Sequence, residues 1–134
     1  MSLKVKIFSF SYKYGTIPED DSGNGGGFVF DCRFIDNPGR IERFKDSKGS
    51  DEDIIEYLDN TPAMQDFLWN VYRMISPLIE NYISRNFTNL QISFGCTGGR
   101  HRSVYAAEHL ASFLRENYPE TEIEIIHSQF FINQ

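Results

Sequence analysis

The chain has 134 residues, of which 40% are hydrophobic and 15% aromatic, and this is enough for one domain with its own core. Its formal net charge of −6 disfavours broad nonspecific nucleic-acid binding, which depends on many Lys and Arg side chains. The sequence contains no apolar run near the ~20 residues that a bilayer span needs and no signal-peptide pattern, so we expect a cytoplasmic protein without membrane contact.

The first part of the chain predicts two strands joined by a long loop. Polar and apolar residues alternate over 4–10, which predicts a strand, and a polar, aromatic loop follows at 11–15. Residues 16–27 are rich in Gly and acids and contain Pro18, which is typical of a mobile surface loop. A second, short strand is expected over 28–32.

The middle of the chain predicts helices. Ser50 or Asp51 is the expected N-cap of a helix that ends near Asp59. Thr61-Pro62 has the pattern of a second helix start, and the apolar residues that follow recur on one helical face. The aromatic residues of this helix, including Trp69 and Tyr72, are expected in the core. Pro77 predicts a kink or a junction between two helices.

The last third predicts a strand over 90–94, a helix over 103–117 and a strand over 122–126. Strands that alternate with helices indicate one α/β domain over residues 1–134, with a mostly parallel sheet in a three-layer-like arrangement. We expect His109 to be a surface residue, and the sequence offers no visible partner for His127.

Ligands of such sheets bind beyond the carboxyl ends of the strands. Three predicted strands are followed by the segments 12–15, 31–34 and 95–102. We expect these segments to converge on one site. Arg33 shares a strand face with Asp31, so an ion pair and a ligand contact are alternatives for it. Lys13 lies in a comparable place, where a ligand contact and a solvated side chain are alternatives.

The turn between the third predicted strand and its helix is the strongest functional signal. A strand, a Gly-rich turn and a helix present backbone N–H groups and the positive end of a helix dipole to an anion. The turn lacks the Gly-Lys-Ser/Thr ending of a Walker A loop. The candidate ligand-binding residues are Cys96, Thr97, Gly98, Gly99, Arg100, His101, Arg102 and Ser103, joined by Arg33 and Lys13. We predict a phosphate or carboxylate site here, with an ordinary strand-to-helix turn as the alternative.

The same turn also matches a catalytic pattern. Cys96, Arg102 and Ser103 reproduce the Cys-x5-Arg-Ser/Thr spacing of cysteine-dependent phosphatases, so Cys96 and Arg102 are the alternative catalytic residues. Gly95 stands where those enzymes usually have His, and only Asp31 or Asp36 can be proposed as the general acid. A small residue packed at a strand end is the other interpretation of Cys96.

Cys32 and Cys96 form no disulfide framework by their spacing, and the sequence shows no Cys/His spacing typical of zinc. We therefore predict no metal site. We also expect no cofactor.

Three stretches carry a resemblance to a known family. Residues 9–15 read SFSYKYG, residues 29–34 with Asn37-Pro38 read VFDCRF and NP, and residues 95–105 read GCTGGRHRSVY. Together they closely resemble the C-terminal domain of the RapZ/YvcJ family, the bacterial RNase adapter and nucleotide-binding proteins. The resemblance covers nearly the whole chain, so residues 1–134 are expected to form a single RapZ C-terminal-like domain.

This resemblance implies a fold similar to a phosphofructokinase subdomain, in proteins that carry an N-terminal P-loop ATPase domain. The resemblance further implies a metabolite site at the loop 96–102. In the enterobacterial member this domain senses glucosamine-6-phosphate and binds small regulatory RNA. The chain departs from that member at Gly39 and Asn60, where the member has His and Arg at the metabolite site, and in lacking its Lys/Arg-rich tail.

Our leading hypothesis is a non-catalytic sensor or adapter domain that recognises a phosphorylated metabolite or nucleotide. In it, amides of residues 97–100 hold the phosphate, His101 and Arg102 supply charge, and Arg33 closes the site. A cysteine-dependent phosphatase and an RNA-binding module are the alternatives. The expected partner is a small phosphorylated ligand, with RNA, a protein partner and an oligomer left open.

Overall fold

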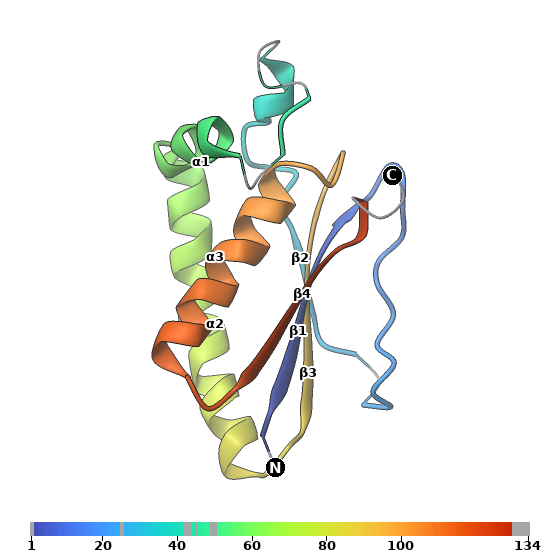
Figure 1. The fold of residues 1–134 in the computed structure, drawn as a ribbon, viewed down its shortest axis with the longest axis vertical. Helices are drawn as coiled ribbons and strands as arrows, with labels where there is room; N and C mark the ends of the chain where they lie inside the picture. Colours follow the sequence, from blue (N-terminus) through green and yellow to red (C-terminus); the bar gives the residue numbers. More distant parts are fainter. Residues whose placement is uncertain (1, 25, 42–43, 45, 49–50, 130–134) are drawn as a thin grey trace.

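The computed structural model describes residues 2–24, 26–41, 44, 46–48 and 51–129. Every strand and helix expected from the sequence is present (Figure 1). In chain order the elements are β1 (Lys4–Ser11), β2 (Phe28–Asp31), the short 3-10 helix η1 (Pro38–Arg40), α1 (Glu52–Asp59), α2 (Pro62–Ser84), β3 (Asn89–Cys96), α3 (Arg102–Asn117) and β4 (Glu122–His127).

The four strands form one parallel sheet in the order β2-β3-β1-β4, so the α/β prediction is confirmed. Ser11 pairs with Cys96 across β1 and β3, and Asp31 pairs with Gly95 across β2 and β3. Three strands therefore end at nearly the same level. The loops that follow them leave from one edge of the sheet, which is where ligands bind in this class of fold.

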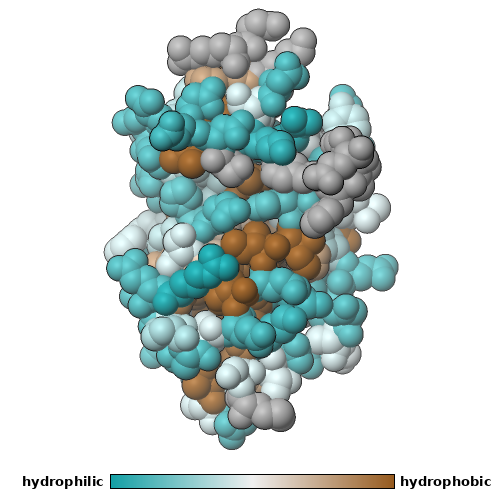
Figure 2. Space-filling model, in the orientation of Figure 1, coloured by the Kyte–Doolittle hydropathy of each residue, from teal (hydrophilic) through white to brown (hydrophobic). Residues whose placement is uncertain are grey.

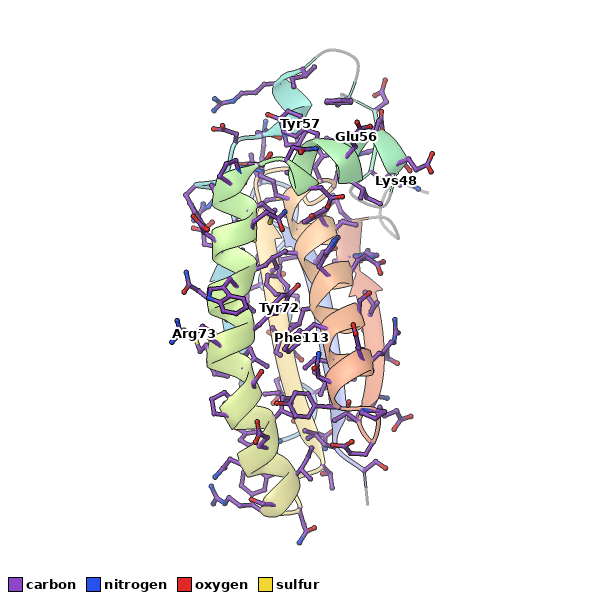
Figure 3. The ribbon with its side chains drawn as sticks, turned by 90° about the vertical axis from the view of Figure 1, so that its left-hand side faces the viewer. Lys48, Glu56, Tyr57, Tyr72, Arg73 and Phe113 are labelled. Atoms are coloured by element: carbon purple, nitrogen blue, oxygen red, sulfur yellow. The ribbon has the colours of Figure 1, made fainter. Side chains whose placement is uncertain are left out.

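The helices cover one face of the sheet (Figure 1). Side chains alternate between the faces of a strand, and the apolar ones, such as Ile7 and Ile92, point toward the helices and are fully buried. Tyr72 of α2 and Phe113 of α3 stack with ring centroids 4.2 Å apart, where Figure 3 shows the two helices side by side. The hydrophobic core thus lies between the helices and the sheet.

The segment between β1 and β2 lies along the other face of the sheet (Figure 1). The Nε2 of Gln91 donates to the carbonyl of Pro18 at 3.0 Å, and Lys6 pairs with Asp21 at 3.0 Å. A Cβ on Gly27 would lie 2.0 Å from the carbonyl oxygen of Gln91, so only glycine fits there. The sequence predicted a mobile surface loop, but these contacts seat the segment on the sheet as a third layer.

The structure bears on two expectations for α2. The helix is continuous through Pro77, so the alternative of two helices that meet there is wrong, and Pro77 lies on the exposed side of α2. Trp69 is 63% exposed rather than buried. The buried stripe of α2 runs through Leu68 and Val71, and a helix turns about 100° per residue, so Trp69 faces away from it.

The outer surface is mostly hydrophilic on the face that Figure 2 shows. Apolar surface gathers near the middle of this face, where the outer strand β4 crosses the view of Figure 1. Ile123 and Ile125 of β4 are partly buried against the core. Within the described ranges, we find no helix with the length and apolar character needed to cross a membrane.

Candidate functional site

The loop from β3 to α3 is shaped by two glycines with different roles. Gly99 has φ +71°, and a Cβ there would lie 2.9 Å from the backbone nitrogen of Ser11. Gly99 is therefore needed for the loop to pack against β1. A Cβ on Gly98 would meet nothing within 4 Å. Gly98 thus leaves open space in front of the loop.

Ser11 joins this loop to the end of β1. Its Oγ donates to the carbonyl of Thr97 at 2.6 Å and accepts from the N–H groups of Lys13 at 3.1 Å and Tyr14 at 2.8 Å. The hydroxyl thereby uses its donor and both lone pairs. The loop after β1 and the loop after β3 are held as one unit, as the predicted convergence of these segments requires.

Arg102 is a buried cation at the start of α3. Only 3% of the residue is exposed, and its Nη1 donates to the carbonyls of Arg33 at 2.9 Å and Ile35 at 2.8 Å. Its Nε is buried and has no hydrogen-bond partner among the residues that the structure describes. A buried charge is costly unless it is paired, so this side chain favours an anion beside it.

His101 fixes the loop rather than supplying charge. Its Nε2 donates to the carbonyl of Ser47 at 2.5 Å. Burial lowers the pKa of His101 below 6.5, and the nearby Arg100 and Arg102 act in the same direction. The imidazole is therefore mostly neutral at pH 7, which corrects the expectation of a positive charge at this position.

These residues surround a pocket of about 280 Å³ at the carboxyl edge of the sheet. Its lining residues are Lys13, Tyr14, Asn37, Gly39, Cys96, Thr97, Gly98, Arg100, His101 and Arg102. They include three permanent cations, and none of these described residues is Asp or Glu. The positive end of the 16-residue helix α3 adds to the same potential. The pocket can therefore bind an anion.

A larger cavity of about 630 Å³ lies against α1. Its lining includes the carboxylates of Asp36, Asp53 and Glu56. Figure 3 shows Glu56 on α1 next to Tyr57, another lining residue. Three carboxylates repel an anion, so charge rather than size identifies the smaller pocket as the candidate site.

The side chain of Arg33 does not line the pocket, which corrects the expectation that it closes the site. Its Nη2 lies 2.6 Å from Oδ2 of Asp31, and its guanidinium lies 3.8 Å from the ring centroid of Tyr12. Residues two apart on an extended segment share a face, so the ion pair between Asp31 and Arg33 forms instead. Arg33 contributes to the site through its carbonyl, which accepts from Arg102.

Cys96 lies in the pocket wall, and its Sγ is 3.2 Å from Oγ of Ser103. The two residues proposed as a general acid are elsewhere. Asp31 is paired with Arg33, which lowers the pKa of its carboxyl, and Asp36 lines the acidic cavity. A Cβ on Gly95 would lie 2.4 Å from the Phe10 ring, so no side chain fits where phosphatases have His.

Gly39, a position that the family resemblance placed at the metabolite site, lines the pocket together with Asn37, and a Cβ on Gly39 would lie 3.4 Å from the His101 ring. Sequence reasoning missed the place of Asn37 in the lining and the partners of His127. His127 has partners after all. Its Nδ1 lies 2.6 Å from Oγ of the buried Ser9, and its Nε2 lies 2.9 Å from Glu108. No local sequence signal indicates this link, because Ser9 and His127 are 118 residues apart.

A second cluster joins α1 to α3. The hydroxyl of Tyr105 donates to Oδ1 of Asp59 at 2.5 Å, and the Nε2 of Gln65 donates to the same hydroxyl at 3.1 Å. His109 stacks on Tyr105, with ring centroids 3.9 Å apart, so it is not a simple surface residue. This cluster holds α1 beside α3 and stands outside the pocket lining. The described residues contain no group of three or more His, Cys, Asp and Glu suited to a metal ion.

Comparison with known proteins adds a family assignment to this geometry. A family model described as the RapZ C-terminal domain matches residues 3–130. A protein of Thermosipho africanus named "Nucleotide-binding protein" is 38% identical over 114 residues, which cover 85% of this chain and 39% of that relative. The chain therefore spans about two fifths of the length of this relative.

Proposed function

Because the chain belongs to the RapZ C-terminal domain family, we propose that it is a non-catalytic sensor domain for a phosphorylated metabolite or nucleotide. One observation carries the proposal: the buried Arg102 has an unpartnered Nε in a pocket whose described lining contains cations and no carboxylate. A phosphate group supplies the oxygens that these donors lack.

The phosphate lies in front of Gly98, where the absent side chain leaves room for it. Backbone N–H groups of residues 97–100 and the hydroxyl of Thr97 donate to its oxygens. Lys13 and Arg100 supply positive charge from the pocket lining, and the buried Arg102 supplies a further positive charge. His101 holds the turn in place through the carbonyl of Ser47.

A sensor needs a ligand that touches separate segments, and this pocket is lined by three. They follow β1, β2 and β3, and a bound phosphate contacts the charged side chains of two of them. The domain would report occupancy to a protein partner as an adapter in the cytoplasm. The relative's name, "Nucleotide-binding protein", agrees with a nucleotide as one ligand class. A long polyanion such as RNA suits a pocket of about 280 Å³ poorly.

Isothermal calorimetry with inorganic phosphate, sugar phosphates and nucleotides tests the proposal. We expect at least one of these compounds to bind the wild-type domain and to lose about tenfold or more in affinity in Arg100→Ala and Lys13→Ala, since each removes a charge from the pocket. Arg73→Ala removes an exposed charge on α2 (Figure 3) and serves as the matched control. Failure of every phosphate compound to bind at millimolar concentration contradicts the proposal.

One contact favours a second function, the cysteine-dependent phosphatase. The hydroxyl of Ser103 lies 3.2 Å from the Cys96 thiol, where it can stabilise a thiolate that attacks phosphorus. Incubation with an aryl phosphate tests this function. Product release that disappears in Cys96→Ser supports it, while an equal background rate in both proteins excludes it. Because no described carboxylate lines the pocket, we expect the background rate.

A further inference from the structure

Tyr14 is an exposed aromatic side chain at the rim of the phosphate pocket. It lines the pocket, yet 61% of the residue is exposed to solvent. Its backbone N–H donates to Oγ of Ser11 at 2.8 Å, so its main chain is fixed to the same hydroxyl that holds the phosphate loop. The Nζ of Lys13 lies 5.1 Å from the centroid of the Tyr14 ring. The ring is therefore held beside the anion site with much of its surface in water.

The size of the pocket indicates where a ligand larger than phosphate must go. Sites that enclose a drug-sized ligand measure roughly 300–1,000 Å³. The pocket of about 280 Å³ lies just below that range, so a phosphate and the group next to it fill it. The rest of a larger ligand passes over the rim, and Tyr14 is the phenol ring among the described lining residues.

We propose that Tyr14 is a stacking platform for a nucleobase and that the pocket prefers a nucleoside monophosphate over a sugar phosphate. This inference rests on the proposed phosphate site. Nucleobases stack on aromatic side chains without needing specific hydrogen bonds. Tyr14 and the phosphate loop line the same small pocket, so base and phosphate are separated by the sugar alone, as in a monophosphate.

The two ends of the pocket support a phosphate on the buried side and a base on the solvent side. The buried Nε of Arg102 marks the phosphate end, and the exposed ring of Tyr14 marks the solvent end. Lys13 spans both, since it lines the pocket and lies by the ring. The area of the ring that a base can cover is the main contribution to stacking.

Calorimetry on the whole chain with inorganic phosphate, ribose 5-phosphate and adenosine monophosphate tests the inference. We expect the wild type to bind adenosine monophosphate about tenfold or more tighter than ribose 5-phosphate. Tyr14→Ala should remove this margin while the affinity for ribose 5-phosphate stays the same. Tyr14→Phe should keep the margin, because the ring and not the hydroxyl stacks. Trp69→Ala, which removes an exposed aromatic of α2, is the matched control.

Each outcome separates the two proposals. The stacking platform is overturned if the wild type binds adenosine monophosphate and ribose 5-phosphate with equal affinity. It is also overturned if Tyr14→Ala loses affinity equally for these two compounds. Both results leave the phosphate site intact. A margin that survives in Tyr14→Ala also overturns the stacking platform, because the base is then recognised elsewhere. If none of the three compounds binds while another phosphate compound does, the stacking platform is overturned and the phosphate site stands. If no phosphate compound binds, the phosphate site itself is wrong.

Discussion

The Nη1 of Arg102 lies 2.8 Å from the carbonyl oxygen of Ile35, and the same nitrogen reaches the carbonyl of Arg33 at 2.9 Å. Arg102 belongs to α3, whereas the two carbonyls belong to the segment after β2. One guanidinium thus holds the segment after β2 against α3 and also faces the pocket. The residue is therefore part of both the fold and the site.

Replacement of Arg102 should show this double role. We expect Arg102→Ala to lower the free energy of unfolding by about 2–4 kcal/mol, because one buried and one part-buried carbonyl lose a charged donor. Denaturant unfolding followed by circular dichroism measures the change. Arg73→Ala, an exposed residue of α2, should stay within about 0.5 kcal/mol of the wild type. A loss below that level for Arg102→Ala would show that the two carbonyl contacts contribute little.

The two glycines of the loop should respond in opposite ways. Gly99→Ala places a Cβ 2.9 Å from Ser11 N at a φ of +71°, so it should destabilise the fold by about 1–3 kcal/mol. Gly98→Ala meets no protein atom within 4 Å and should leave stability nearly unchanged. Its methyl group instead occupies the proposed phosphate position and should weaken phosphate binding. Thermal unfolding and calorimetry on both variants measure the contrast, and a destabilised Gly98→Ala contradicts it.

His101 should make the fold less stable in weak acid. Burial lowers its pKa in the folded state, so the unfolded chain binds the proton more readily. The stability that the neutral imidazole contributes is complete above about pH 6.5, its unfolded pKa, and is lost as the pH falls toward the folded pKa. Unfolding free energies from pH 8 to pH 5 should fall more steeply for the wild type than for His101→Gln. Parallel curves would exclude His101 as the source.

The Tyr105 hydroxyl should couple α1 to α3 energetically. It donates to Asp59, whose carboxylate is half-exposed, so solvent screening limits the pair to about 1 kcal/mol. A double-mutant cycle of Tyr105→Phe and Asp59→Asn, read by denaturant unfolding, measures the coupling. Burial and this hydrogen bond raise the pKa of Tyr105, so its phenolate should form only at a higher pH than the phenolate of an ordinary tyrosine. Additive losses in the cycle would mean that the short contact carries no net coupling.

The elements and the location of the pocket could be predicted from local patterns. Alternation and helical spacing located the strands and helices. Because the carboxyl ends of parallel strands meet at one edge of the sheet, the order of the elements also placed Lys13 beside the Gly-rich loop. The role of Arg33 was predicted wrongly. The alternation of side chains along a strand allowed Arg33 to contact either Asp31 or a ligand, and it gave no reason to prefer one of them. The role of His101 depends on Ser47, which is 54 residues away. Contacts of this kind arise from tertiary packing and leave no periodic signal.

The Oγ of Ser11 has a mechanical consequence. By holding Thr97, Lys13 and Tyr14 at once, it makes two walls of the pocket a single rigid body built on β1 and β3. The third wall, the turn Pro38–Arg40, lies against the ring of His101, which a Cβ on Gly39 would approach to 3.4 Å. A ligand that contacts all three walls would therefore join the turn after β2 to the unit built on β1 and β3.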